Sequence, residues 1–177
     1  MIEVKFINKS FEGNPILNDV SAKFEQGKTN LIIGQSGSGK TVLLKCLLGL
    51  HEPDNGEVLF DGISTSEMTE SQKTFLRRDM GMVFQGSALF DSMTVLENVM
   101  FPLVMLTEKN HDEIIEIAQN VIKRVELENA FSKLPSELSG GMQKRVAIAR
   151  AIVMNPKYLF CDEPNSGLDP KTAIVID

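Results

Sequence analysis

A glycine-rich segment at residues 34–41 (GQSGSGKT) contains the residue types that bind phosphate groups. Its glycines let backbone N–H groups turn inward around an anion, and the start of the helix expected after it adds partial positive charge. Lys40 can reach the outer phosphates of a nucleotide, and the Thr41 hydroxyl can ligate Mg²⁺. A flexible Gly/Ser linker is the alternative, but apolar runs on both sides favour a strand–loop–helix unit. The residues expected at the nucleotide are Gly34, Gln35, Ser36, Gly37, Ser38, Gly39, Lys40 and Thr41.

Two acids, Asp162 and Glu163, follow a second short apolar run at residues 158–161 (YLFC). Asp162 can hold Mg²⁺ through water, and Glu163 can take a proton from an attacking water. A strand-end helix cap is the alternative reading of this pair. Gln85 follows an expected strand at residues 80–84 (MGMVF), and its amide can orient water or contact the metal. The prediction is therefore a catalytic set of Glu163, Gln85 and Lys40, and a metal set of Thr41, Gln85 and Asp162.

A second candidate phosphate site lies at residues 138–143 (LSGGMQ), where a helix is expected to begin. Ser139 is a good N-cap, so the simplest interpretation is a capped helix. That interpretation does not explain Gly140 and Gly141, which weaken a helix and leave bare amides at its start. Bare N–H groups beside a serine hydroxyl can bind phosphate.

Several elements must position these residues. Alternation at Ile2, Val4 and Phe6, and again at residues 20–24 and 56–60, predicts antiparallel strands. The apolar runs at residues 29–33 (TNLII) and 158–161 predict strands buried on both faces of a parallel sheet. Apolar residues at helical spacing predict a helix over residues 111–125 whose stripe packs in the core. The fold class is therefore α/β with a helical insertion.

Composition limits the classes of partner. The 177 residues are 42% hydrophobic, which is enough for one globular unit with a core, and the net charge of −6 argues against broad attraction to nucleic acid or an anionic bilayer. We expect no membrane span and no signal peptide, because the longest apolar stretches are short. Cys46 and Cys161 are both expected to be buried rather than to bind metal.

The motifs together resemble those of one family. GQSGSGKT, Gln85, LSGGMQ, YLFCDE and residues 165–169 (NSGLD), in this order, are similar to the Walker A, Q-loop, signature, Walker B and D-loop segments of the ATP-binding cassette (ABC) ATPases. The resemblance covers essentially the whole chain. It implies a P-loop NTPase core with a mostly parallel sheet flanked by helices and an N-terminal antiparallel β part. The expected parts are residues 1–91 for the core with the P-loop, 92–138 for a helical subdomain, and 139–177 for the signature helix, Walker B and D-loop.

The resemblance also implies ATP and Mg²⁺ as cofactors and a head-to-tail homodimer that encloses two ATP molecules. Phe11 matches the aromatic residue that stacks on adenine, although core packing is an alternative for it. Asp169 would lie at the dimer interface. The residues expected to contact the partner's nucleotide are Ser139, Gly140, Gly141 and Gln143.

One family element is missing. The family continues past the D-loop to a helix and a strand that ends in a switch histidine, whereas this sequence ends at Asp177, and neither His51 nor His111 stands at that position. We therefore expect the usual domain to be shortened at its C-terminal end, and this stretch of chain to bind nucleotide but hydrolyse it poorly.

Residues 85–103 (QGSALFDSMTVLENVMFPL) resemble the corresponding segment of the Mla-type ATPases, which move phospholipids between bacterial membranes with a permease and an MCE-type lipid-binding protein. This resemblance implies permease subunits as partners and a place on the cytoplasmic face of the inner membrane. Leu89, Phe90 and Met93 would contact the permease or pack within the helical subdomain. The alternatives are an amino-acid or methionine-type importer ATPase, a soluble non-transport ABC ATPase, and a regulatory nucleotide-binding module. The soluble repair ATPases usually separate these two motifs by a long coiled coil, and the spacing of about a hundred residues between Gly34 and Leu138 counts against that class.

Overall fold

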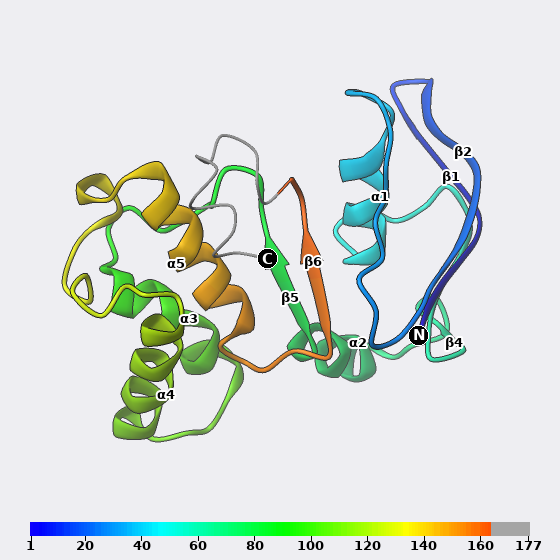
Figure 1. The fold of residues 1–177 in the computed structure, drawn as a ribbon. Helices are drawn as coiled ribbons and strands as arrows, with labels where there is room; N and C mark the ends of the chain where they lie inside the picture. The colour runs from blue at the N-terminus through cyan, green and yellow to red at the C-terminus, as the bar shows by residue number, and fades with distance from the viewer. Residues whose placement is uncertain (164–177) are drawn as a thin grey trace. The chain divides into compact units, whose positions relative to one another are not determined.

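The structure of the chain is a computed structural model that describes residues 1–163 (Figure 1). Backbone contacts divide the chain into two compact units, one at Met1–Arg77 and one from Arg78 onward, and each is described by itself. The expected D-loop at residues 165–169, with Asp169, lies outside the described residues. Within residues 1–163, no helix is long and apolar enough to cross a bilayer.

The first unit is built on a four-stranded antiparallel sheet, which confirms the strands expected near the N-terminus. The strands stand in the order β2-β1-β3-β4. Ile2, Val4 and Ile7 of β1 are buried, as are Val58 and Phe60 of β3. The bounds are β1 (Ile2–Phe11), β2 (Asn14–Phe24), β3 (Asn55–Phe60) and β4 (Ile63–Ser64).

The alternation in β1 breaks at Phe6, whose side chain is 63% exposed although the pattern placed it with the buried residues. Phe6 has φ 52°, and the register of β1 against both neighbours shifts between Val4 and Asn8. Gly56 lies against this bulge with φ 93°, and a Cβ there would stand 2.4 Å from the Phe6 carbonyl oxygen. The extra residue moves Ile7 into the core in place of Phe6.

Residues 29–33 do not form the expected buried strand. Within residues 1–163 no strand pairs with them, and Leu31 and Ile33 are 79% and 85% exposed. A strand needs hydrogen-bonding neighbours, and the sheet of this unit is completed by other segments, so the β-propensity of TNLII has no ladder to join.

Two helices complete the first unit. Helix α1 (Lys40–Leu47) follows the phosphate loop as expected, and its buried face carries Leu43, Leu44, Cys46 and Leu47. Helix α2 (Glu70–Arg78) has no buried residue, and its Phe75 is exposed. The prediction that Cys46 is buried is confirmed.

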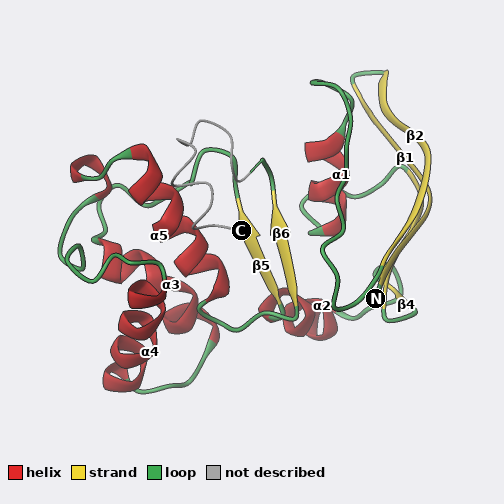
Figure 2. Ribbon diagram, viewed as in Figure 1, coloured by secondary structure: helices red, strands yellow, loops and turns green. Residues whose placement is uncertain are grey.

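The second unit contains two parallel strands, drawn as neighbouring yellow arrows in Figure 2. They are β5 (Met80–Val83) and β6 (Tyr158–Cys161), paired in register from Met80 with Tyr158 to Val83 with Cys161. The expectation that β6 is buried on both faces is wrong, because Phe160 is buried while Leu159 and Cys161 are exposed. In the part of the chain that the structure describes, β6 has one strand neighbour, which covers it less than the centre of a wide sheet would.

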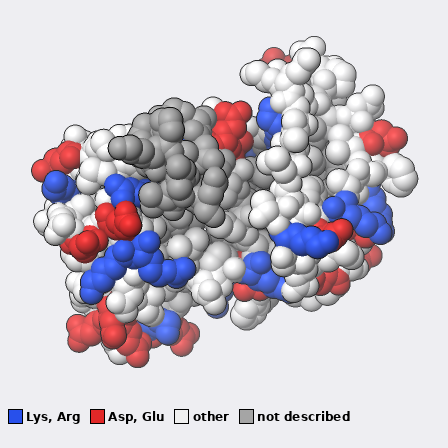
Figure 3. Space-filling view, in the orientation of Figure 1, with Lys and Arg blue, Asp and Glu red and all other residues white. Residues whose placement is uncertain are grey.

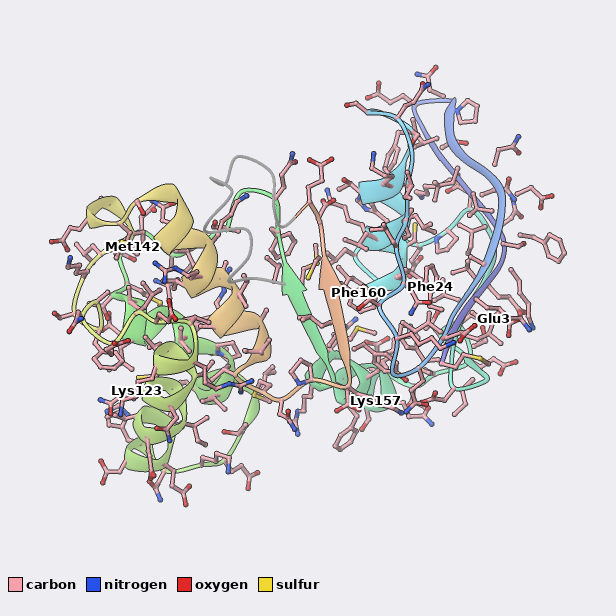
Figure 4. The ribbon with its side chains drawn as sticks, viewed as in Figure 1. Glu3, Phe24, Lys123, Met142, Lys157 and Phe160 are labelled. Carbon is pink, nitrogen blue, oxygen red and sulfur yellow. The ribbon has the colours of Figure 1, made fainter. Side chains whose placement is uncertain are left out.

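Three helices form the core of the second unit, with a short 3₁₀ turn at Pro135–Glu137. They are α3 (Val95–Leu106), α4 (His111–Arg124) and α5 (Gly140–Ile152). The expected stripe of α4 is confirmed, since Ile114, Ala118, Val121 and Ile122 are buried. Thr94 and Asn110 begin α3 and α4 with capping boxes closed by Glu97 and Glu113. Figure 4 shows Met142 in the first turn of α5 and Lys123 in the last turn of α4.

Charged side chains of both signs lie interspersed over the face drawn in Figure 3. That face therefore has a mixed charge, in keeping with a chain that carries 18 basic and 24 acidic residues.

Candidate nucleotide-binding site

The phosphate loop bends through glycines in the left-handed region. Gly37 has φ 78° and Gly39 has φ 93°, so an L side chain would be strained at both positions. Gly39 is also the N-cap of α1 and provides no side chain to its first amides. A Cβ on Gly39 would stand 2.9 Å from Leu17 Cδ2 and 3.0 Å from the Ile16 carbonyl oxygen. The loop is therefore seated on β2 at a point where only glycine fits.

Lys40 folds back across the loop. Its Nζ donates hydrogen bonds to the carbonyl oxygens of Gly34 at 2.9 Å and Gln35 at 3.0 Å, while the Ser38 amide donates to Gln35 at 3.1 Å. The ammonium group is thus held inside the loop that is expected to surround the phosphates. Thr41 is the second residue of α1, where a hydroxyl can face the same anion.

Phe11 stands at the end of β1 with its side chain 40% exposed. The His51 ring meets it edge-on at 5.3 Å between centroids, and Lys9 Nζ lies 5.5 Å from the ring centre. Asp54 accepts hydrogen bonds from Lys9 Nζ at 2.7 Å and from the Ser10 amide at 2.6 Å. These bonds hold the pKa of the Asp54 carboxyl below its ordinary value, the Lys9 bond contributing most. An exposed ring supported in this way can stack on a base.

In the second unit, the parallel strands bring three predicted residues to one sheet edge. The Asp162 amide donates to the Val83 carbonyl oxygen at 2.9 Å, which continues the ladder one residue beyond β6. Gln85 Nε2 donates a hydrogen bond to Glu163 Oε2 at 2.8 Å. Glu163 has φ 48°. The predicted general base and the predicted water-orienting amide are therefore in direct contact.

The predicted metal ligands are hard oxygen donors. Among residues 1–163, no cluster of three His, Cys, Asp or Glu residues could hold a metal by itself. Mg²⁺ usually keeps several waters and takes one or two protein oxygens together with substrate phosphates. Thr41 in the first unit, and Gln85 and Asp162 in the second, each offer a side-chain oxygen, the donor type that Mg²⁺ prefers, whereas structural zinc sites usually take Cys and His.

The signature segment begins α5 as expected. Ser139 caps the helix by accepting a hydrogen bond from the Met142 amide at 3.3 Å, and a Cβ on Gly140 would meet nothing within 4 Å. The side chain of Gln143 instead points back along the chain and donates to the Pro135 carbonyl oxygen at 3.0 Å. Gln143 thus ties the segment to the preceding turn.

Sequence reasoning missed four residues that support these groups. In the first unit, the His51 ring meets Phe11 edge-on, and Asp54 holds Lys9, whose ammonium group lies over the Phe11 ring. Asn98 and Arg150 bind the chain just after Gln85 in the second unit. A signal for Asn98 was present, since a single polar amide in the apolar stretch VLENVMFPL suggests a buried hydrogen-bonding role.

Comparison with known proteins gives a consistent family. A sequence model described as "ABC transporter" matches residues 17–166. The chain is 42% identical over 169 residues to a probable ribonucleotide transport ATP-binding protein, mkl, of Mycobacterium leprae, covering 96% of this chain and 49% of that protein. It is 43% identical over 174 residues to the L-cystine import ATP-binding protein TcyC of Bacillus subtilis, covering 97% and 70%. It is 41% identical to the methionine import ATP-binding protein MetN of Clostridium tetani, covering 97% and 54%.

Among solved structures, the chain resembles the ATP-binding cassette MJ0796, described as a dimer in a post-hydrolysis state bound to ADP and Pi. The TM-score is 0.91 at 36% identity, over 99% of this chain and 79% of that one. The P-loop NTPase cassette fold expected from the motifs is thereby confirmed. The chain spans about half the length of the mycobacterial relative it matches.

Proposed function

We propose that this chain, which belongs to the ABC transporter family, binds ATP with Mg²⁺, and that the full-length protein hydrolyses the nucleotide to drive transport. The observation that carries the proposal is the hydrogen bond between Gln85 and Glu163 at the carboxyl ends of β5 and β6. A module that only binds nucleotide has no need for a carboxylate paired with a water-orienting amide. The contact therefore supports hydrolysis over the regulatory alternative.

The proposed roles follow from the chemistry of each group. Lys40 and the amides of residues 34–41 bind the phosphates, and Phe11 stacks on the base. Bound Mg²⁺ would supply charge neutralisation at the phosphates, with Thr41, Gln85 and Asp162 as its protein ligands. Glu163 accepts the proton of the attacking water, which the Gln85 amide orients.

We propose a head-to-tail dimer in which Ser139, Gly140 and Gly141 contact the nucleotide of the partner copy, with Asp169 at the interface. Two features support it: the N-terminus of α5 is capped by a serine followed by glycines, and the similar cassette MJ0796 is described as a dimer. Gln143 would act through the turn it holds at Pro135.

For the cargo, three of the relatives favour a small polar solute of the amino-acid class, since two are described as L-cystine and methionine import ATP-binding proteins and one as a glutamine transport ATP-binding protein. The mkl relative is instead described as a probable ribonucleotide transport ATP-binding protein. Phospholipid is the second candidate, favoured by residues 85–103 and implying an MCE-type partner. In both cases the protein would bind permease subunits at the cytoplasmic face of the membrane.

Helices α3 and α4 fall in the proposed helical subdomain, residues 92–138.

The test is to purify the full-length protein with its membrane partners through a tag on the ATPase, and to measure phosphate release in lipid nanodiscs. We expect turnover that depends on Mg²⁺ and is stimulated by the cognate cargo. Stimulation by an amino acid through a binding protein, or by phospholipid through an MCE-type protein, decides between the two cargo classes. Absence of any turnover in the complete complex would refute the proposal.

A further inference from the structure

Arg150, near the end of the signature helix, reaches the segment that follows Gln85. Its two terminal nitrogens donate hydrogen bonds to consecutive carbonyl oxygens, Nη1 to Ala88 at 2.8 Å and Nη2 to Ser87 at 2.9 Å. The guanidinium also lies 5.7 Å from the centre of the Phe90 ring. A planar fork with two donors on adjacent carbonyls fixes both position and orientation.

The carbonyls that Arg150 holds belong to a strained stretch of backbone. Ser87 has φ 61° and Ala88 has φ 47°, both in the left-handed region although neither is glycine. Two such residues in succession persist only where surrounding contacts enforce the conformation. The Arg150 fork is one such contact on this turn, and Ser87 is itself buried.

The far end of the same segment is held by Asn98 of α3, which is fully buried. Its amide accepts from the Phe90 N–H at 2.8 Å and donates to the carbonyl oxygens of Phe90, Met93 and Thr94 at 3.0–3.1 Å. The Phe90 ring packs against Phe101 at 4.7 Å between centroids. Gln85 and Phe90 therefore lie on one constrained loop, and Arg150 contacts it between them.

We propose that Arg150 is a positioning residue that couples the signature helix to Gln85. The helix that begins at Ser139 carries the arginine two residues before its end, so a displacement of α5 is transmitted to the turn at Ser87 and Ala88. That turn lies two residues from Gln85, which contacts Glu163. This inference rests on the proposed ATPase function and adds to it a residue that acts through the loop without touching nucleotide.

The test compares Arg150→Met with Arg145→Met in the full-length protein within its complex. Arg145 is a matched control: it lies on α5 and also donates to two consecutive carbonyls, those of Val125 and Glu126 at 3.2 and 3.3 Å, away from the Gln85 loop. Loss of charged hydrogen bonds of this kind changes an equilibrium constant by about tenfold or more. We therefore expect Arg150→Met to lower kcat by about tenfold, with the KM for ATP changed by less than about twofold. Arg150→Lys keeps the charge but not the two-pronged guanidinium, so its kcat should lie between those of wild type and Arg150→Met.

Hydrogen exchange supplies a readout that does not depend on turnover. Amides of residues 85–94 should exchange faster in Arg150→Met than in wild type. In Arg145→Met their exchange rates should equal those of wild type. An unchanged kcat or unchanged exchange in Arg150→Met would overturn the inference, as would an equal loss of kcat in Arg145→Met. If Arg150→Met does not fold, kcat and hydrogen exchange measured on Arg150→Lys decide whether the inference holds. If the wild-type complex shows no turnover, the proposed function fails, and the exchange comparison alone decides the role of Arg150.

Discussion

Gln85 Nε2 and Glu163 Oε2 lie 2.8 Å apart, although 78 residues separate them in the sequence. Parallel pairing of β5 with β6 makes this contact, because it brings the carboxyl ends of both strands to the same edge.

Glu163→Gln removes the proton acceptor and keeps an oxygen that can accept from Gln85. General-base catalysis is worth about 10²–10⁴-fold, so we expect kcat for ATP hydrolysis to fall at least about a hundredfold while ATP binding persists. Phosphate release and nucleotide retention on the full-length complex measure this. The exposed Glu128, changed to Gln, is the control. Retained turnover in Glu163→Gln would show that another group accepts the proton.

Lys40→Met removes the ammonium group that Gly34 and Gln35 hold in the loop. We expect the Kd for ATP to rise about tenfold or more, since a charged contact to phosphate is lost. Titration with a fluorescent ATP analogue measures it. Lys45→Met in the last turn of the same helix should leave Kd close to the wild-type value. Equal effects of the two variants would indicate loss of helix charge rather than loss of a phosphate contact.

Gly39→Ala should destabilise the protein more than Gly37→Ala. Both glycines have positive φ, which costs an alanine about 1–2 kcal/mol, but only at Gly39 would the new Cβ also meet Leu17 and the Ile16 carbonyl oxygen. We expect a loss of roughly 2–4 kcal/mol for Gly39→Ala and about 1 kcal/mol for Gly37→Ala. Urea unfolding gives both values, and the reverse order would contradict the contact seen at Gly39.

Phe11→Ala should weaken ATP binding by about tenfold, because stacking of a base on an aromatic ring is worth about 1–3 kcal/mol. Triphosphate without a base should bind equally to both forms, which separates stacking from phosphate contacts. Phe6→Ala, also exposed and also on β1, is the control. If Phe11→Ala binds ATP as wild type does, the ring is only a packing residue.

Asp54→Asn should reduce stability in a pH-dependent manner. The hydrogen bonds from Lys9 and Ser10 lower the pKa of Asp54 in the folded protein, so its contribution is present above the ordinary aspartate pKa and is lost as pH falls through the lowered value. The stability difference between wild type and variant should therefore be largest near neutrality and shrink below about pH 4. Thermal unfolding at a series of pH values measures it, with the exposed Asp91→Asn as control. A difference that does not depend on pH would rule out the charged carboxylate as the cause.

Helices α1, α4 and α5 and most strands could be predicted because their signals are local, whereas α2 was not predicted. The stripe of α4 and the Ser139 cap depend on residues within a few positions of each other, and both are confirmed. The bulge at Phe6 could not be predicted, since it depends on the close approach of Gly56 from another strand. The same holds for Arg150, whose role comes from carbonyls 62 and 63 residues away.

The amino-acid sequence by itself determined the chemistry: a glycine loop with lysine and threonine, an acidic pair after an apolar run, and a serine–glycine helix start each require particular residue types at short spacing. Tertiary structure decided which of those residues touch. It placed Gln85 on Glu163, turned Gln143 toward Pro135, and gave residues 29–33 no strand partner among residues 1–163. The physical reason is that side-chain type is encoded locally, whereas hydrogen-bond partners and burial depend on segments that meet only when the chain folds.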